Sequence, residues 1–186
     1  MRKDFGVKSW LYPQPVLIIS SYNEDGTADA MNAAWGGTSE DDEISMCISS
    51  GHKTTTNILR NKAFTVSIGD ASHMAECDYV GIVSGNNEKD KLSKAGFTTE
   101  KSKFVNAPII NELPLALECT LSSYDKESGR MVGKILNVSA DEKVLDSNGN
   151  IDSGKLDAII FDPISHYYRI VGQKVGNAFS DGKKIK

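Results

Sequence analysis

Polar residues crowd residues 49–60, SSGHKTTTNILR, where a predicted strand ends and a helix begins. The backbone N–H groups and the positive dipole end of such a helix point toward one place. Hydroxyl groups and one lysine surround that place: Ser49, Ser50, Thr54, Thr55, Thr56 and Lys53. These donors suit a terminal monophosphate, because neither the GxxxxGK[ST] nor the GxGxxG phosphate loop occurs. A well-capped helix with a polar first turn explains them equally well. Arg60 fits either a second phosphate charge or a solvated helix residue.

A second candidate segment is MNAAWGGTS, residues 31–39. Small residues flank Trp35 and two glycines follow it, so the backbone can approach a flat ligand closely. Asn32 offers both a donor and an acceptor to the edge of a heterocycle. A strand end with a core tryptophan is the alternative interpretation.

Two later segments are weaker candidates. Ser84-Gly85-Asn86 separates two predicted helices and can close over a ligand, whereas the charges of residues 88–91 are expected on a solvated helix face. Near the C-terminus, Tyr167, Tyr168 and Phe179 lie between glycines. Aromatic residues there can stack on a ring, seal a dimer interface or simply pack.

Other catalytic templates find little support. The histidines are His52, His73 and His166, with no HExxH pair, and no GxSxG nucleophile elbow occurs. A triad built from scattered Ser, His and Asp residues stays open, although nothing marks an elbow or an oxyanion hole. Cys47, Cys77 and Cys119 form no CxxC motif, and we expect reduced, buried thiols.

The pattern of apolar residues and turns predicts many strands and few helices. The predicted strands are residues 16–20, 27–35 (ending at the break Gly36-Gly37), 43–49, 63–68, 115–124, 130–138, 158–161 and 167–171. The predicted helices are residues 53–61, 72–83 and 88–95. Hairpin loops at residues 23–26 and 125–129 favour antiparallel pairing. We therefore predict a mainly β protein, a closed or partly closed antiparallel barrel with helical decoration, in a single domain of residues 1–186.

The chain has 186 residues, a formal net charge of -4 and 39% hydrophobic residues, which suits one globular domain with a real core. The acidic balance argues against nucleic acid as a partner. The basic tail of residues 182–186 is expected to be a solvated terminus. The N-terminus has no apolar signal region, and the run PVLIIS is too short to cross a bilayer. We expect a cytoplasmic protein with no membrane contact.

Four pieces stand in a characteristic order: MNAAWGGT, SSGHKTTTNILRNKAFTVSI, CDYVGIVSGNNEKDKLSKAGFT and YYRIVGQKVGNAFSDGK. Together they resemble the flavin-reductase-like FMN-binding split β-barrel family, and within it the flavoredoxin group. The resemblance runs from about residue 15 to the C-terminus. It implies an antiparallel Greek-key split β-barrel that forms a homodimer, with FMN near the subunit interface.

The resemblance also implies site residues. The segment matching residues 32–35 borders the isoalloxazine, and the segment matching residues 49–55 holds the phosphate and ribityl chain. The implied FMN-binding residues are Asn32, Ala33, Ala34, Trp35, Ser49, Ser50, His52, Lys53, Thr54 and Thr55, followed by Ser84, Gly85, Lys91, Tyr168 and Phe179. Family members often carry Arg where this chain has Gly51-His52, and His52 is a weaker, pH-dependent phosphate partner.

The implied function is that of an FMN-dependent oxidoreductase with NADH or NADPH as the electron donor. The flavin carries the chemistry at N5, so no dedicated catalytic residue and no metal are expected. Two versions remain open, an NAD(P)H:flavin reductase and a flavoredoxin-like carrier that passes electrons to a redox protein. A non-redox module that binds another planar ligand or a partner protein is the alternative from a different class.

Overall fold

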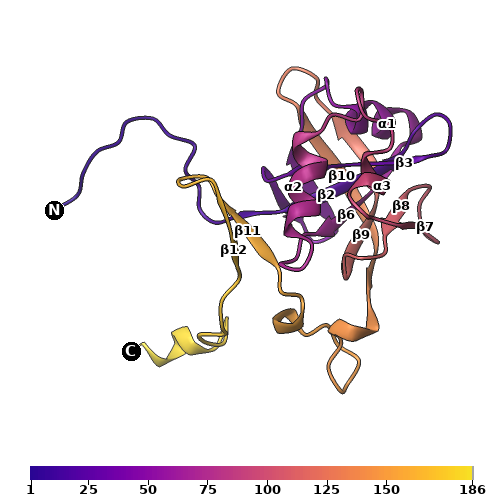
Figure 1. Cartoon of the computed structure of the whole chain (residues 1–186). Coiled ribbons are helices and arrows are strands. Elements are labelled where there is room, and N and C mark those ends of the chain that lie inside the picture. Colours follow the sequence, from indigo (N-terminus) through magenta and orange to yellow (C-terminus); the bar gives the residue numbers. More distant parts are fainter. Residues whose placement is uncertain (186) are drawn as a thin grey trace.

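The computed structural model describes residues 1–185, and its main sheet has seven strands, in the order β3-β2-β6-β9-β10-β5-β4 (Figure 1). Every neighbouring pair in this sheet is antiparallel. The strands are β2 (Leu17–Tyr22), β3 (Ala28–Ala33), β4 (Gly36–Glu40), β5 (Glu43–Cys47), β6 (Ala63–Ile68), β9 (Leu115–Tyr124) and β10 (Arg130–Ala140).

The connection between β3 and β4 explains why this sheet curls. Only Ala34 and Trp35 separate the two strands, yet β3 and β4 lie at opposite ends of the sheet order. Six strand spacings of about 4.8 Å would place the edges of a flat sheet roughly 29 Å apart, far beyond the reach of two residues. The edges therefore approach each other, and the predicted split β-barrel is confirmed. The expected break at Gly36-Gly37 was wrong, because these glycines begin β4.

Both faces of β2 are buried, which accounts for its continuous apolar run. Leu17 and Ile19 pack inside the barrel with Phe64, whereas Val16 and Ile18 belong to a second core on the outer face. The interior is filled closely: a Cβ atom at Gly133 of β10 would lie 2.3 Å from Cζ of Phe64. A glycine is therefore required where β10 passes this ring.

Three helices gather over β2 and β3 (Figure 1). They are α1 (Lys53–Asn61), α2 (Met74–Ile82) and α3 (Lys91–Lys94). The predicted bounds of α1, β6 and β9 are confirmed, but the helix predicted over residues 88–95 is wrong in length, since only one turn forms. The second core, which includes Cys77 and Val80 of α2, lies between these helices and the sheet.

Smaller elements complete the chain. The strands β1 (Gln14–Pro15), β11 (Ile159–Asp162) and β12 (Tyr167–Ile170) form a separate sheet, and β7 (Thr99–Lys101) pairs with β8 (Pro108–Ile110). Short 3-10 helices cover Glu142–Val144, Ser153–Lys155 and Asp181–Lys184. The strands β1, β4, β7 and β8 were not predicted from the sequence.

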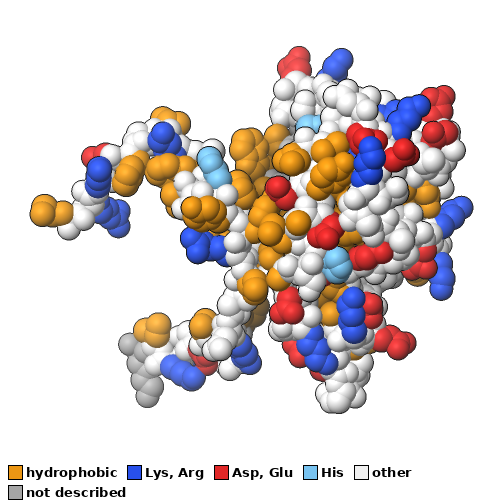
Figure 2. All heavy atoms as spheres, in the orientation of Figure 1, with side chains coloured by type: hydrophobic (Ala, Val, Ile, Leu, Met, Phe, Trp, Pro, Cys, Tyr) orange, Lys and Arg blue, Asp and Glu red, His pale blue; other side chains and the backbone are white. Residues whose placement is uncertain are grey.

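Both ends of the chain extend away from the barrel on the same side (Figure 1). Figure 2 shows hydrophobic side chains along both extensions and on the neighbouring part of the barrel. Phe5, Trp10, Val171 and Phe179 are among the exposed hydrophobic residues there. Residues 182–185 of the basic tail are exposed as expected, and Lys186 lies outside the described residues. No helix formed by residues 1–185 is long and apolar enough to span a membrane.

Candidate functional site

The start of α1 is open to an external ligand. After β5 the chain turns through residues 48–52 and enters the helix at Lys53. Among the described residues, no side chain caps this end, because His52 makes no capping hydrogen bond and the first turn has no acidic residue. The first-turn N–H groups and the positive dipole end therefore remain available to an anion. Of the two interpretations of residues 49–60, the well-capped helix is therefore wrong.

Several polar groups surround this helix start. Ser49, Ser50 and His52 are exposed, and Lys53 is half-buried without a salt bridge to any of residues 1–185. The hydroxyl of Ser49 accepts a 3.3 Å hydrogen bond from the backbone N–H of Gly51. These candidate donors therefore flank the start of α1.

Thr54 and Thr55 contribute in a different way from the one expected. Both are buried, and each hydroxyl already donates a hydrogen bond inside the protein: Thr54 to Oδ2 of Asp29 at 2.6 Å, and Thr55 to the carbonyl of Ser49 at 2.8 Å. They anchor the helix start while their backbone N–H groups face its open end. Arg60 donates to the carbonyl of Tyr22 at 2.8 Å, at the opposite end of α1.

Trp35 lies in the connection that joins the two edges of the sheet. Its side chain is 56% exposed, so the interpretation as a core tryptophan was wrong. Trp35 lines a hollow of about 390 Å³ together with Cys47, Ser49, Ser50 and the hairpin loop of residues 126–129. The fold thus brings the predicted ring-binding segment and the predicted phosphate-binding segment to a common hollow.

The rest of the predicted ring-binding segment contacts α2. The amide of Asn32 donates to the carbonyl of Cys77 at 3.0 Å, while Ala33 and Ala34 are half-buried beside it. Tyr168 reaches the same helix, since its hydroxyl donates to Oδ1 of Asp78 at 2.7 Å. Burial raises the pKa of Tyr168, and Asp78 adds to this shift through its hydrogen bond and its charge.

Phe179 does not join this site within one subunit. Its side chain is 98% exposed on the C-terminal extension. The structure therefore brings Trp35 together with Ser49 and Ser50, which precede α1, but leaves this aromatic residue apart from them.

The loop of residues 84–86 packs directly against the start of α1. Asn86 donates from its amide to the carbonyl of Gly51 at 3.1 Å, and Ser84 is exposed. A Cβ atom at Gly85 would lie 2.5 Å from Oδ1 of Asp29 and 3.2 Å from Cβ of Lys53, so only glycine fits there. Lys53, Gly85 and Asn86 line a second hollow of about 400 Å³.

Lys91 does not lie on the solvated helix face that was expected for residues 88–91. Residues 88–91 were expected on a solvated helix face, and Lys89 and Asp90 are indeed exposed. Lys91 is buried instead, with its Nζ 3.4 Å from Oδ1 of Asp29. Its side chain points into the protein and away from any ligand in solution.

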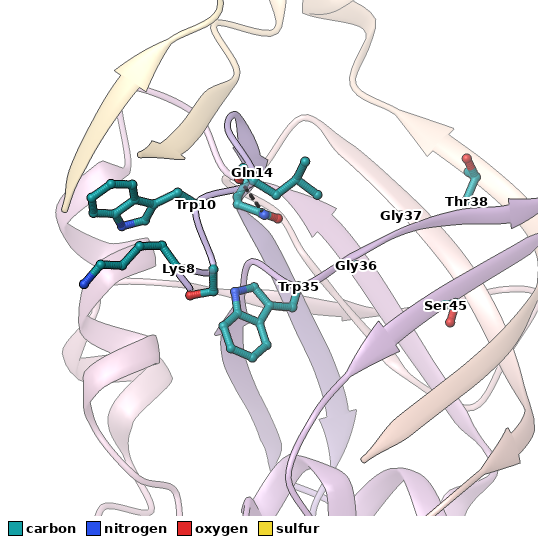
Figure 3. Close-up of a pocket in the computed structure, with 10 residues that line it drawn as sticks. Lys8, Trp10, Gln14, Trp35, Gly36, Gly37, Thr38 and Ser45 are labelled. Atoms are coloured by element: carbon teal, nitrogen blue, oxygen red, sulfur yellow. Dashed lines mark hydrogen bonds between the residues drawn. The ribbon is translucent and has the colours of Figure 1, made fainter. Parts of the chain in front are cut away.

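Trp10, Lys8 and Cys47 were not among the site residues predicted from the sequence. Trp10, Lys8 and Gln14 border a hollow of about 790 Å³ on another side of Trp35, and Figure 3 shows the two indole rings facing this opening. The aromatic-rich stretch SWLY was the sequence signal that could have pointed to this hollow.

Cys47 is exposed, which contradicts the expectation of three buried thiols, whereas Cys77 and Cys119 are buried.

The structure does not support a Ser-His-Asp triad at His73 or a metal site among the described residues. Nδ1 of His73 lies 2.9 Å from Oδ1 of Asp70, and the same oxygen accepts from the backbone N–H of His73. Within residues 1–185, no serine hydroxyl is hydrogen-bonded to His73, so this pair is not part of a triad. The described residues also form no cluster of three or more His, Cys, Asp or Glu side chains that could hold a metal.

Comparison with known proteins agrees with this geometry. A family model described as "Flavin reductase like domain" matches residues 9–156. The chain belongs to this family. The flavoredoxin of Desulfovibrio vulgaris (Miyazaki F) is 34% identical to this chain, and its structure superposes with a TM-score of 0.93 over 98% of this chain and 100% of the other. The predicted membership of the flavoredoxin group is confirmed.

Two further relatives are more distant. The flavoredoxin from Methanosarcina acetivorans shares 24% identity and the same fold, with a TM-score of 0.88 over the whole of both chains. An uncharacterised protein of Aquifex aeolicus (strain VF5) is 26% identical over 155 residues, which is 77% of each chain.

The donor set of this flavin-reductase-like domain fits a flat ring that carries an anionic tail. Trp35 and the small residues before it offer a planar surface, and the open start of α1 with Lys53 offers the anion site. The hollow at Trp35 is also lined by Ser49 and Ser50, whose hydroxyls suit a polar linker, whereas Lys53 lines the second hollow.

Proposed function

We propose that this chain binds FMN and works as an FMN-dependent oxidoreductase with NADH or NADPH as electron donor. The observation that carries the proposal is the uncapped start of α1 beside a hollow that exposes Trp35. An uncapped helix start with a free lysine attracts a phosphate, and an exposed indole next to it attracts a ring.

Each part of the ligand has residues to receive it. Lys53 and the first-turn N–H groups of α1 would hold the phosphate, and Ser49 and Ser50 would contact the ribityl hydroxyls. Residues 32–35 would border the ring. Bound FMN supplies the capacity to accept a hydride and pass on electrons. The chain's own residues bind it, orient it and keep one side of the ring accessible.

The hollow beside Trp10 supports access for an electron donor. It lies next to Trp35, measures about 790 Å³ and is open at the surface, so a second planar ring has room there. Lys8 at its rim offers a cation to a dinucleotide phosphate. A flavoredoxin-like carrier would need only an exposed ring edge and a redox protein partner.

We also infer a homodimer in the cytoplasm. The extensions at both chain ends expose large hydrophobic side chains that a lone subunit would leave in water. A second copy that packs between them would cover these side chains and bring the partner's C-terminal segment near the ring site. The three free cysteines suit a reducing compartment.

The test is the absorbance spectrum of the purified protein, followed by mixing with NADH and NADPH without air. We expect a yellow protein that releases FMN on denaturation and is bleached by at least one nicotinamide. A protein that carries FMN but reacts with neither nucleotide would be a carrier. A colourless protein that cannot be reconstituted with FMN would overturn the proposal and leave a non-redox binding module.

A further inference from the structure

A buried ion pair lies directly behind the proposed phosphate site. Lys91 of α3 and Asp29 of β3 are each 3% exposed, with 3.4 Å between Nζ and Oδ1. Nζ of Lys91 also donates to the carbonyls of Val80 and Val83, at 3.3 Å and 3.1 Å. These carbonyls belong to the last turn of α2 and its C-terminal cap, where the negative dipole end favours a cation. The buried charge of Lys91 is therefore well matched.

The second oxygen of Asp29 connects this pair to α1. Oδ2 accepts the 2.6 Å hydrogen bond from Thr54, which lies in the first turn of the helix. Gly85 packs against the other oxygen of the same carboxylate. A continuous set of contacts, which we call the Lys91 network, thus runs from the end of α2 through Lys91, Asp29 and Thr54 to the start of α1.

The ion pair in this network also affects the electrostatic potential at the start of α1. The Asp29 carboxylate is one hydrogen bond away from the first turn of α1. Left unpaired in a buried position, it would repel a phosphate bound there, because Coulomb repulsion is poorly screened away from water. Lys91 neutralises this carboxylate and so keeps the helix start attractive to an anion.

We propose that Lys91 and Asp29 are positioning residues for the FMN phosphate. They fix the start of α1 and the loop of residues 84–86, and they do not touch the ligand. This inference rests on the proposed function and deepens it. It replaces the direct contact that the family resemblance implied for Lys91 with an action through Asp29 and Thr54.

The test compares FMN with riboflavin, which has the same ring but no phosphate, by titrating apo-protein and following flavin fluorescence. We expect Lys91→Met to weaken FMN binding about tenfold and to change riboflavin binding by less than about twofold, because only the phosphate senses the unpaired carboxylate. Adding Asp29→Asn to Lys91→Met removes that charge and should restore most of the FMN affinity. Lys53→Ala serves as the positive control for a direct phosphate contact.

Lys94→Met is the matched control, because Lys94 lies on the same helix but is 54% exposed and pairs with Glu88 at the surface. It should bind both flavins like the wild type. If Lys91→Met does not fold, as judged by urea unfolding, Thr54→Val tests the same connection without removing a charge. It should also weaken FMN more than riboflavin.

The outcomes separate this inference from the proposed function. Equal loss of both flavins in Lys91→Met would mean a general structural role, and unchanged FMN binding would mean no role; either result overturns the inference while FMN binding by the wild type stands. A wild-type protein that binds neither flavin overturns both.

Discussion

Cys47 is the residue that departs most from its expected place. It is exposed in the hollow beside Trp35, and its Sγ donates to the carbonyl of Ser128 at 3.2 Å. Cys77 and Cys119 are buried, and burial raises the pKa of each thiol to about 12. The three thiols should therefore differ strongly in reactivity, since the thiolate is the reactive form.

We predict that a thiol reagent such as DTNB labels one cysteine of the native protein near pH 8 and all three in urea. Cys47→Ser should abolish the native reaction. Saturating FMN should slow it at least about fivefold, because the ligand would fill the hollow that Cys47 lines. Native labelling of Cys77 or Cys119, or a Cys47 rate unaffected by FMN, would contradict this placement.

Two alternatives at the scale of single residues could not be separated from the local sequence: the position of Trp35 and the capping of α1. Trp35 could have been a core residue, but the closure of the sheet places it outside the barrel. The start of α1 could have been capped, but the N-cap residue His52 makes no capping hydrogen bond, and the hydroxyls of Thr54 and Thr55 turn inward. Neither outcome is contained in the local sequence, because each depends on strands far away in the chain.

At the scale of elements, the hydrogen bond from Tyr168 to Asp78 joins β12 to α2. Burial and this bond raise the pKa of Tyr168 above its ordinary value of about 10. The bond's contribution to stability is complete below about pH 10. It falls as the pH rises further, because the unfolded chain then loses the phenolic proton that the folded chain retains.

We predict that Tyr168→Phe lowers the free energy of unfolding by about 1 kcal/mol near pH 8, the usual size of a partly exposed hydrogen bond. The difference from the wild type should shrink by about pH 11. Urea unfolding at both pH values measures it. Tyr167→Phe is the control, since that neighbouring side chain is exposed. A difference that stays constant or grows with pH would argue against the link to Asp78.

Elements with strong periodic patterns were predicted well, and those set by distant contacts were not. The bounds of α1, β6 and β9 follow from their own residues. β4 has the sequence GGTSE and is mostly exposed, so only pairing with β5 makes it a strand. α3 was predicted too long, because residues 89–90 form a turn and the helix begins only at Lys91. The charge run was also taken as a solvated face, although Lys91 is buried.

For the whole molecule, we predict twice the chain mass in sedimentation equilibrium or light scattering. Val171→Asp, which places a charge on the exposed C-terminal extension, should shift the protein toward monomer. Phe104→Asp is the matched control, because this exposed residue lies between β7 and β8, on the side of the barrel away from the extensions (Figure 1). A monomeric wild type, or equal effects of both substitutions, would rule out this interface.

The two-residue connection between β3 and β4 also limits how the chain can change in length. Ala34 and Trp35 bridge the edges of the sheet without slack. Because side chains alternate between faces along a strand, one inserted residue would either bulge out or turn β4 over against β5. Length variation among relatives should therefore avoid this connection and collect in loops such as residues 146–151 or 125–129.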